Sequence, residues 1–369
     1  MYQITREDIF SIPQGSLYNP QMMSKAEEAA SFLGELRSIA SGIADYSYIV
    51  TALKNIESLG SAKIEGTTGN LDDLYQEENL AVERKKKLKL FSAVGYKLGL
   101  DQLQEILHQG NEINLVLLRH LHKIITQNDP ATYGVPGKLR EGNVIIRNLK
   151  LGDIAPPESI FVPELIETYF QQKNCQEQKS LVQIAVGHYQ FESIHPFSDG
   201  NGRVGRLLIS TYLLNEGWLN EPILNLSNYF EKNRDQYLEN LREITEKKDY
   251  VNWVRFFLDG IIAQARQTLE TIQELKQLRE KSLILIKQSI KGTAIPIETL
   301  DFSLNKLYFT IQDFNVHLAG NSYGLKDPAQ TAGDNIRRLE RLKILEKSHK
   351  KGRADVYCNP DLKKLLSRQ

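Results

Sequence analysis

The chain has 369 residues, 41% of them apolar and 25% charged, and its 46 basic residues balance its 46 acidic ones. Length and composition predict two or three domains with a real core, and the zero net charge gives the whole molecule no electrostatic preference for nucleic acid or anionic lipid. The two cysteines, Cys175 and Cys358, exclude a disulfide framework and a CxxC-type metal site. The N-terminus lacks the pattern of a signal peptide, and no run of about 18 uncharged apolar residues suits a membrane span, so we expect a cytoplasmic protein with no membrane segment.

The first informative segment in chain order is residues 61 to 66, with the sequence SAKIEG. On a helix, Ser61 and Glu65 are four residues apart and share a face, and Gly66 can end the helix in a left-handed turn. Taken alone, Glu65 is an ordinary exposed glutamate near a helix end.

A break in the helical pattern runs from residue 131 to residue 163, where several glycines and a double proline interrupt it. It contains a short run of β-favouring residues, Val144, Ile145 and Ile146, followed by Arg147. This run predicts a hairpin or flap followed by an extended loop. From the residues alone, a flap that faces a partner and a buried structural hairpin fit equally well.

Residues 195 to 206 lie between two helical patterns, and their composition predicts a phosphate-binding turn. Gly200 and Gly202 flank Asn201, which permits a tight turn whose backbone N–H groups can approach an anion. An apolar helical pattern follows at once, so the positive end of that helix points to the same place.

Charged side chains around this turn fit a bound polyphosphate. Arg203 and Arg206 lie three residues apart in the first turn of the helix, where positive charge opposes the helix dipole unless an anion binds between them. Asp199 is placed to hold a divalent cation that bridges two phosphates. His195, at the end of the preceding helix, can take the proton of a hydroxyl that attacks phosphorus. Each residue alone has an ordinary structural explanation, but the arrangement as a whole predicts an active site.

The segment from residue 195 to residue 206 resembles the signature HPFxxGNGRxxR of the Fic family (filamentation induced by cAMP), and every fixed position is matched. The resemblance covers roughly residues 50 to 260. It implies a mainly α protein, a Fic-fold helical bundle with a β-hairpin flap. It also implies an enzyme that transfers AMP from ATP to a protein hydroxyl and releases pyrophosphate.

The resemblance gives each site residue a role. His195 would be the general base, Asp199 the Mg²⁺ ligand, and Arg206 the contact to the γ-phosphate of ATP. The implied nucleotide-binding set is Gly200, Asn201, Gly202, Arg203, Val204, Gly205, Arg206 and Tyr237. A tyrosine at position 237 also fits a plain core position. Residues 144 to 147 fall at the place of the family's flap, which aligns the target segment by strand addition.

Residues 61 to 66 match the family's inhibitory motif, [S/T]xxxE[G/N], which lies N-terminal to the catalytic core. The implied inhibitory residues are Ser61, Glu65 and Gly66. By this resemblance Glu65 pairs with Arg206, occupies the position of the γ-phosphate and leaves the α-phosphate misaligned, so we expect weak basal activity. In some relatives the corresponding glutamate also serves the removal of AMP, which the sequence leaves open.

The C-terminal part predicts a winged helix-turn-helix domain. Its predicted elements are a long helix at 253–279, a connecting helix at 281–291, helices at 310–319 and 329–345, and a basic hairpin at 349–357. An Asp-Pro pair marks the start of the last helix. Between residues 334 and 353, eight basic residues stand against three acidic ones, a charge that could contact DNA phosphates. Because the whole molecule is neutral and no base-reading pattern is visible, we favour protein contact or dimerisation for this domain.

These features together predict three parts: an N-terminal helical region with the inhibitory helix at 1–84, a Fic catalytic domain at 85–280, and a winged helix-turn-helix domain at 281–369. The predicted function is a protein adenylyltransferase that uses ATP and Mg²⁺ and modifies a Tyr, Thr or Ser hydroxyl of a target protein. Self-modification and a homodimer are left open. The alternatives are a Fic-fold transferase that uses another nucleotide and a DNA-binding regulator that only senses ATP. The intact His195 argues against the regulator, because sensing needs no general base.

Overall fold

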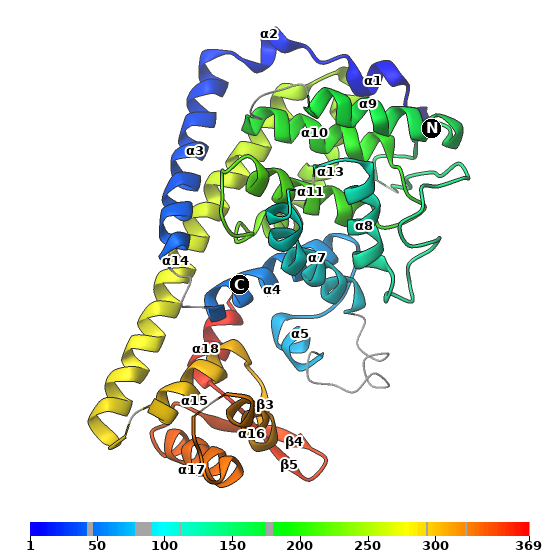
Figure 1. Ribbon diagram of the computed structural model, residues 1–369. Coiled ribbons are helices and arrows are strands. Elements are labelled where there is room, and N and C mark those ends of the chain that lie inside the picture. The colour runs from blue at the N-terminus through cyan, green and yellow to red at the C-terminus, as the bar shows by residue number, and fades with distance from the viewer. Residues whose placement is uncertain are drawn as a thin grey trace. The chain divides into compact units, whose positions relative to one another are not determined.

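The computed structural model describes residues 1–42, 47–77, 90–110, 112–148, 150–174, 180–292, 294–321 and 323–368 (Figure 1). The chain forms two compact units. Unit 1 comprises residues 1–42, 57–68 and 89–268, and unit 2 comprises residues 43–56, 69–88 and 269–369. Cys175 and the predicted domain boundary at residues 84 and 85 lie outside the described residues. The division of the chain into three parts stays a prediction.

Unit 1 consists mainly of helices. They are α1 (Arg6–Phe10), α2 (Gln14–Leu17), α3 (Pro20–Ser41), α7 (Phe91–His108), α8 (Leu115–Thr126), the 3₁₀ turn η1 (Ser159–Phe161), α9 (Val162–Asn174), α10 (Leu181–Ile194), α11 (Asn201–Asn215), α12 (Leu226–Lys232) and α13 (Arg234–Lys247). Two further helices, α4 (Ser47–Ile64) and α14 (Tyr250–Ser289), have residues in both units. The predicted mainly α fold is confirmed.

Short polar residues begin several of these helices. The side-chain oxygens of Asn19 and Asn114 accept N–H groups of the first turns of α3 and α8. Ser180 and Gln183 form a reciprocal capping box at the start of α10. Such caps satisfy N–H groups that a helix cannot pair internally. The helix that leads to the candidate histidine therefore has a defined start.

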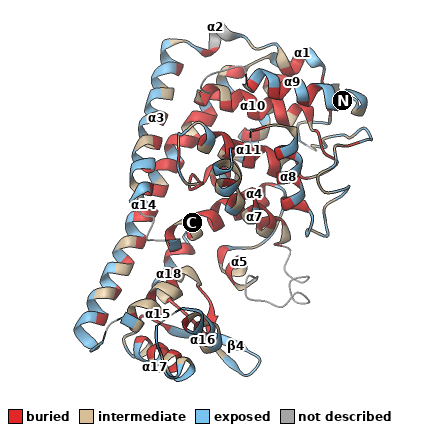
Figure 2. Ribbon diagram, viewed as in Figure 1, coloured by how far each residue is buried: buried red, intermediate tan, exposed pale blue. Residues whose placement is uncertain are grey.

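Helices α10 and α11 form the centre of unit 1. Nearly all of their side chains are buried (Figure 2), as expected for helices that are covered on every side. Helix α10 packs on α9 and α11, and α11 packs on α7 and α8. The buried Trp253 of α14 donates its indole N–H to the Ala185 carbonyl of α10 at 2.8 Å. The loop between α10 and α11 is thus held between two well-packed helices.

The predicted break in the helical pattern is present, because residues 127–148 and 150–158 contain no helix. Strand β2 (Ile154–Ala155) pairs in parallel with β1 (Tyr2–Gln3), and Ile146 forms a single antiparallel bridge with Ile154. The turn that follows Ile146 is closed by the Gly152 N–H, which donates to the Asn148 carbonyl at 2.7 Å. Residues 144–147 therefore form an extended segment with one bridge rather than a regular strand of a hairpin.

Helix α14 is longer than the sequence pattern predicts. The helices expected at 253–279 and 281–291 belong to one helix of 40 residues, Tyr250–Ser289. The residues around position 280 are Arg, Glu, Lys and Ser, none of which breaks a helix. No helix in the described part of the chain has the length and apolar character needed to cross a bilayer.

Unit 2 combines helices with a small antiparallel sheet. After α5 (Leu71–Glu77), its elements are α15 (Ala294–Asn305), β3 (Phe309–Thr310), α16 (Ile311–Gly320), α17 (Pro328–Arg341), β4 (Glu346–Lys351), β5 (Ala354–Cys358) and α18 (Pro360–Leu366), and the strand order is β3-β5-β4. Asp327 caps α17 as expected, because its carboxylate accepts the Gln330 N–H at 2.9 Å. Helix α17 ends before the predicted residue 345, since Lys343 adopts a left-handed conformation with φ 58°. The classification of this unit as a winged helix stays a prediction.

Candidate active site

His195 follows the last residue of α10 and lies in the left-handed region, with φ 50° and ψ 61°. A non-glycine residue is found in this region only where its surroundings hold it there. The His195 N–H donates to the Phe191 carbonyl at 3.0 Å, and the buried Arg140 donates through Nε to the His195 carbonyl at 2.8 Å. These bonds fix the turn that places the imidazole at the wall of a pocket.

The imidazole of His195 is neutral, and one contact sets its tautomer. Nδ1 lies 3.3 Å from the Glu192 carbonyl, which is an acceptor, so Nδ1 carries the proton and Nε2 is left as an acceptor. Burial lowers the pKa of His195 to about 4. Near neutral pH the ring is therefore able to take up a proton at Nε2.

The loop between His195 and α11 is braced by Asn201 and His122. The Asn201 side chain accepts the Phe197 N–H at 2.9 Å and donates to the Phe197 carbonyl at 2.8 Å. His122 stacks on the Phe197 ring with 3.8 Å between centroids, and its Nε2 donates to the Asp199 carbonyl at 3.0 Å. The Asn201 side chain thus holds the loop in place through its bonds to Phe197. The backbone N–H of Asn201, in the first turn of α11, is the group that can face an anion.

Helix α11 begins at a glycine turn, with Gly200 at φ 77°. The first N–H groups of a helix have no partner within it, and together with the helix dipole they favour an anion. A Cβ built on Gly202 would lie 2.3 Å from Oε1 of Glu65, so this carboxylate lies directly against the start of the helix. An anionic group of the protein therefore occupies a place suited to phosphate.

The two arginines of the signature have different partners. Nη1 of Arg203 donates to Asp129 at 2.8 Å. Nε of Arg206 donates to the Ser61 hydroxyl at 2.9 Å, and its Nη2 donates to Oε1 of Glu65 at 2.8 Å. The two arginine side chains are only 5% and 2% exposed, and buried charges require such partners. The two arginines, which the sequence placed in the same turn of α11, thus belong to two separate ion pairs.

Glu65 lies just after the end of α4, and its side chain is 44% exposed. Gly66 makes the expected left-handed turn at φ 88°, and Arg234 donates through Nε to the Ile64 carbonyl at 3.0 Å. Burial raises the pKa of Glu65, but the charge of Arg206 and its hydrogen bond lower the pKa by more than burial raises it. The pKa of Glu65 therefore lies below its usual value, and the carboxyl group is ionised at neutral pH. The predicted contact between Glu65 and Arg206 is present, and its inhibitory effect stays a prediction.

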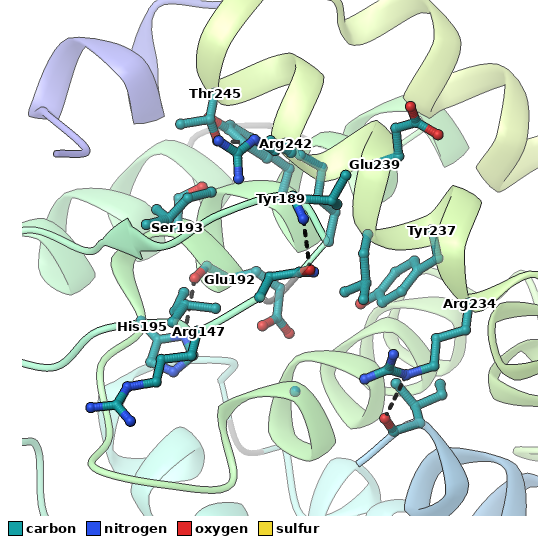
Figure 3. A pocket seen from close by; sticks show the side chains of 18 of the residues that line it. Arg147, Tyr189, Glu192, Ser193, His195, Arg234, Tyr237, Glu239, Arg242 and Thr245 are labelled. Atoms are coloured by element: carbon teal, nitrogen blue, oxygen red, sulfur yellow. Dashed lines mark hydrogen bonds between the residues drawn. The ribbon is translucent and has the colours of Figure 1, made fainter. Parts of the chain in front are cut away.

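These groups meet in a pocket of about 680 Å³. The predicted site residues that line it are Glu65, Ile146, Arg147, His195, Gly202, Arg206 and Tyr237. Figure 3 shows His195 and Tyr237 on opposite sides of the pocket, with Glu192 between them. The predicted site residues that do not line this pocket are Ser61, Gly66, Val144, Ile145, Asp199, Gly200, Asn201, Arg203, Val204 and Gly205.

Three of the predicted nucleotide-binding residues lie at core positions. Tyr237 is 2% exposed, and its hydroxyl lies 2.8 Å from Nε2 of His188. Val204 is fully buried. A Cβ on Gly205 would lie 2.2 Å from Oε1 of Glu192, so a larger residue there would collide with this carboxyl group. Of these three, only Tyr237 also reaches the pocket wall.

Asp199 is the predicted Mg²⁺ ligand. Its Oδ1 accepts the Gly200 N–H at 2.6 Å and its Oδ2 accepts the Tyr133 N–H at 3.1 Å, which leaves further lone pairs on both oxygens. The described residues contain no group of three or more His, Cys, Asp and Glu side chains placed to hold a metal. Asp199 fits an ion bound through one carboxylate, with phosphates and water as its other ligands, as Mg²⁺ prefers.

Two family models match the chain. The Fic/DOC family model matches residues 112–213, and the Fic/DOC family N-terminal model matches residues 23–107. The chain belongs to the Fic/DOC family. The first match contains His195 and the start of α11, and the second contains Glu65.

Curated proteins related to this Fic/DOC chain are named adenylyltransferases. It is 28% identical over 192 residues to a probable protein adenylyltransferase of Aquifex aeolicus, a match that covers 52% of this chain and 54% of the relative. It is 28% identical over 204 residues to the protein adenylyltransferase Fic of Drosophila grimshawi, a match that covers 54% of this chain and 39% of the relative. The chain thus spans about half or less of the length of these relatives.

Solved structures share the fold. A Fic family protein from Desulfovibrio desulfuricans superimposes with a TM-score of 0.58 at 17% identity, over 93% of this chain and 97% of that one. Fic-1 from C. elegans superimposes with a TM-score of 0.51 at 20% identity, over 69% of this chain and 74% of that one. The predicted Fic fold is therefore confirmed.

Several residues at or next to this site of the Fic/DOC chain lie outside the motifs and were not predicted from the sequence. Oε1 of Glu192 is buried without a hydrogen-bond partner among the described residues, and burial raises the pKa of this carboxyl to about 8. Arg140 and His122 support the loop between His195 and α11 from distant parts of the chain, and no local spacing in the sequence indicates these contacts. Glu57 lies four residues before Ser61, and this helical spacing could have revealed it.

Proposed function

We propose that this Fic/DOC protein is a protein adenylyltransferase, which transfers AMP from ATP to a hydroxyl of a target protein. The observation that carries the proposal is the neutral His195 at the wall of a pocket that also contains Arg206 and Gly202 at the start of α11. The names of the curated relatives support the same reaction.

His195 acts as the general base in this proposal. Its Nε2 accepts the proton of the target hydroxyl while the hydroxyl oxygen forms a bond to the α-phosphorus of ATP. The bond between that phosphorus and the bridging oxygen breaks, and pyrophosphate leaves with the bonding electrons. The contact between Nδ1 and the Glu192 carbonyl keeps the ring oriented as its charge changes.

The start of α11 acts as the phosphate site. The N–H groups of its first turn and the guanidinium of Arg206 would stabilise the phosphate oxygens. Arg203, held by Asp129 at 2.8 Å, would add a second positive charge beside them. A Mg²⁺ ion bound through Asp199 would neutralise phosphate charge.

We propose residues 144–147 as the segment against which the target peptide aligns. Ile145 is 49% exposed, and its neighbours Ile146 and Arg147 line the pocket that contains His195. An extended segment at the edge of a site can add a strand from a partner. Strand addition here would present a Tyr, Thr or Ser hydroxyl to the base.

We further propose that Glu65 restrains the reaction. Its carboxylate holds Arg206 and lies against Gly202, so the γ-phosphate of ATP must compete with it for both. The carboxylate is ionised at neutral pH, because Arg206 keeps its pKa below the usual value. Wild-type activity should therefore be low.

The central test uses Glu65→Gly with ATP labelled at the α-phosphate and lysate proteins as targets. We expect label incorporation to rise about tenfold or more over wild type. A tenfold rise corresponds to about 1.4 kcal/mol of binding free energy that ATP no longer loses in displacing the Glu65 carboxylate from the phosphate site. Glu65→Gln keeps the size of the side chain but not its charge, and it should also raise incorporation. If neither variant does so while wild type incorporates label, the restraint by Glu65 is wrong.

The base is tested by His195→Ala in the Glu65→Gly background. We expect incorporation to fall by about a hundredfold or more, as loss of a general base predicts. Persistent incorporation would remove His195 as the base. The Glu65→Gly variant is also tested with other labelled nucleoside triphosphates. If it incorporates label from one of them but not from ATP, the transferred group is not AMP. If it incorporates label from none of these nucleotides, ATP included, the proposed transferase activity is wrong. Mass spectrometry of the labelled protein identifies the target and its hydroxyl residue, this chain included.

A further inference from the structure

Unit 2 carries exposed positive charge that the proposed reaction does not use. Between residues 334 and 353 the chain has 8 of its 46 basic residues and only 3 of its 46 acidic ones. All eight basic side chains are exposed, and we call this set the basic face. It consists of Arg337, Arg338, Arg341, Lys343, Lys347, Lys350, Lys351 and Arg353. Figure 2 shows β4 as an exposed strand over its whole length.

Helix α17 presents part of the basic face. Its residues Ile336 and Leu339 are buried, whereas Arg337 and Arg341, four residues apart, are exposed on another side of the helix. The helix packs on α15 and α16, so the unit holds it in place. A helix is about 10–12 Å wide with its side chains, which matches the width of the DNA major groove, about 12 Å.

The hairpin of β4 and β5 brings further charges next to α17. The hairpin turns at Gly352, which has φ 63°. Strand β4 begins five residues after the end of α17. Burial raises the pKa of Tyr357 in β5, whereas the charges of Lys347 in β4 and Arg337 in α17 both lower it. The helix and hairpin parts of the basic face are therefore neighbours.

Acidic side chains pair with parts of the basic face. Arg337 pairs with Asp334 at 2.8 Å, and Lys347 pairs with Asp355 at 2.9 Å. Both basic side chains are 52% exposed, and such surface ion pairs contribute at most about 1 kcal/mol because water competes for the charges. A phosphate can replace either carboxylate with a small change in free energy.

The composition of the face indicates the kind of partner. Protein interfaces are rich in aromatic side chains at their centre and poor in lysine. Residues 328–353 are all described, and no large hydrophobic side chain among them is strongly exposed. Interfaces with DNA are instead polar and strongly positive. The neutrality of the whole chain does not oppose this, because salt screens exposed charges beyond about 8 Å.

We infer that the basic face binds duplex DNA, with α17 in the major groove and the β4–β5 hairpin against the phosphate backbone. This arrangement follows the general docking of a recognition helix, which reads the groove while neighbouring elements contact phosphates. The composition and exposure of the basic face thus favour DNA over the protein contact or dimerisation that the neutral sequence alone favoured. The inference does not depend on the transferase activity.

The test measures binding of the full chain to a fluorescent duplex of about 20 base pairs, two helical turns, by anisotropy. We expect the logarithm of the affinity to fall linearly with the logarithm of salt concentration, with a slope of about −5 for five or six phosphate contacts. The variant Arg341→Glu/Lys350→Glu/Lys351→Glu should bind about thirtyfold more weakly or worse and reduce the slope by about three.

A matched control is Lys281→Glu/Lys287→Glu/Lys291→Glu, which changes the net charge equally at exposed positions outside the basic face. Its affinity should stay within about twofold of wild type, and thermal melts should show both variants folded. Equal losses in the two variants, or no salt-dependent binding at all, would overturn the inference. A basic-face variant that dissociates a dimer in sedimentation, with no DNA bound by wild type, would make the face an interface between copies of this chain.

Discussion

Arg206 lies among three carboxyl groups whose protonation states differ. Glu65 forms an ion pair with it at 2.8 Å, and the positive charge of Arg206 also acts on Glu57 and Glu192. Burial raises the pKa of Glu57 to about 7 and that of Glu192 to about 8, whereas the pKa of Glu65 lies below its usual value. At neutral pH the guanidinium therefore does not face three full negative charges, and it stays attractive to a phosphate.

Ionisation of Glu192 should weaken ATP binding at alkaline pH. In the Glu65→Gly variant we expect the KM for ATP to rise about threefold to tenfold between pH 5.5 and pH 9. Burial raises the pKa of Glu192 to about 8 in the wild type, and Glu65 adds to this rise. Without Glu65 the carboxyl group therefore ionises at a lower pH, within this wider range, and adds a negative charge beside Arg206. In Glu65→Gly/Glu192→Gln the KM should stay flat, because glutamine has the same shape and cannot ionise. Equal rises in both variants would assign the pH dependence to another group.

The residues of the site differ in how well the sequence predicts them. Glu65 and Arg206 are 141 residues apart, yet their contact was predictable because each belongs to a recognisable motif. Arg140 and His122 were not predictable, since they act through backbone carbonyls of His195 and Asp199. A carbonyl group is the same in every residue, so such contacts leave no pattern in the sequence.

Among the helices, α4 carries Glu57 and Ser61 on one face, and Glu65, just after the end of the helix, continues the same spacing of four residues. The first of them is a fully buried carboxyl group that fastens α4 to its neighbours. Oε2 of Glu57 accepts the Ser227 N–H at 2.9 Å, and Oε1 accepts the hydroxyls of Ser227 and, at 3.2 Å, of Tyr96. The position of Glu65 is thus coupled to hydrogen bonds two helical turns away.

Close backbone packing supports the same coupling. A Cβ built on Gly60 of α4 would lie 2.9 Å from the backbone nitrogen of Asn228 in α12. No side chain fits between the two helices at this point, so α4 has one register against α12. This register also places the C-terminal end of α4, which Glu65 directly follows.

We expect Glu57 to be a positioning residue for Glu65. Glu57→Ala removes the acceptor of three hydrogen bonds, so the end of α4 should loosen and Glu65 should leave Arg206 part of the time. AMP incorporation should rise about threefold to tenfold over wild type, and Glu57→Gln, which keeps the shape, should raise it less.

The double variant separates positioning from a general structural effect. In the Glu65→Gly background, Glu57→Ala should give no further rise, because the glutamate that it positions is absent. Glu105→Ala, at an exposed position of α7, is the matched control and should leave incorporation unchanged. A further rise in the Glu65→Gly background would mean that Glu57 acts by another route, while an inactive Glu65→Gly variant would point to failure of the proposed transferase function instead.

Helix starts were easier to predict than helix ends. The pair Asp327-Pro328 announces α17 because the cap is a local chemical feature. The continuation of α14 beyond residue 279 accompanies burial of Ser282 and Ile286, which no local spacing reveals. Residues 144–147 were predicted as part of a hairpin or flap followed by an extended loop, but strand pairing depends on tertiary context, and in the described part of this segment the pairing is the bridge between Ile146 and Ile154.

At the scale of the whole molecule, burial in unit 1 strongly shifts the pKa of three histidines and two glutamates among the described residues. Burial lowers the pKa of His122 and His195 to about 4 and that of His188 to about 3. Burial raises the pKa of Glu57 to about 7 and that of Glu192 to about 8. The two sets make the stability of the protein depend on pH in opposite directions.

The histidines take up protons near pH 6.5 in the unfolded chain but only near pH 3 to 4 in the fold, so stability falls as the pH falls below 6.5. The two glutamates ionise near pH 4.5 in the unfolded chain but near pH 7 and pH 8 in the fold. The stability that they contribute is therefore full below pH 4.5 and is lost as the pH rises from 4.5 to about 8. Because three histidines outweigh two glutamates below pH 6.5, we expect the Tm of the full chain to peak near pH 6.5 and to fall by about 2–4 °C toward pH 9. Glu192→Gln should flatten the alkaline fall in a thermal melt, and a wild-type Tm that rises steadily to pH 9 would show that these carboxyl groups are not held protonated.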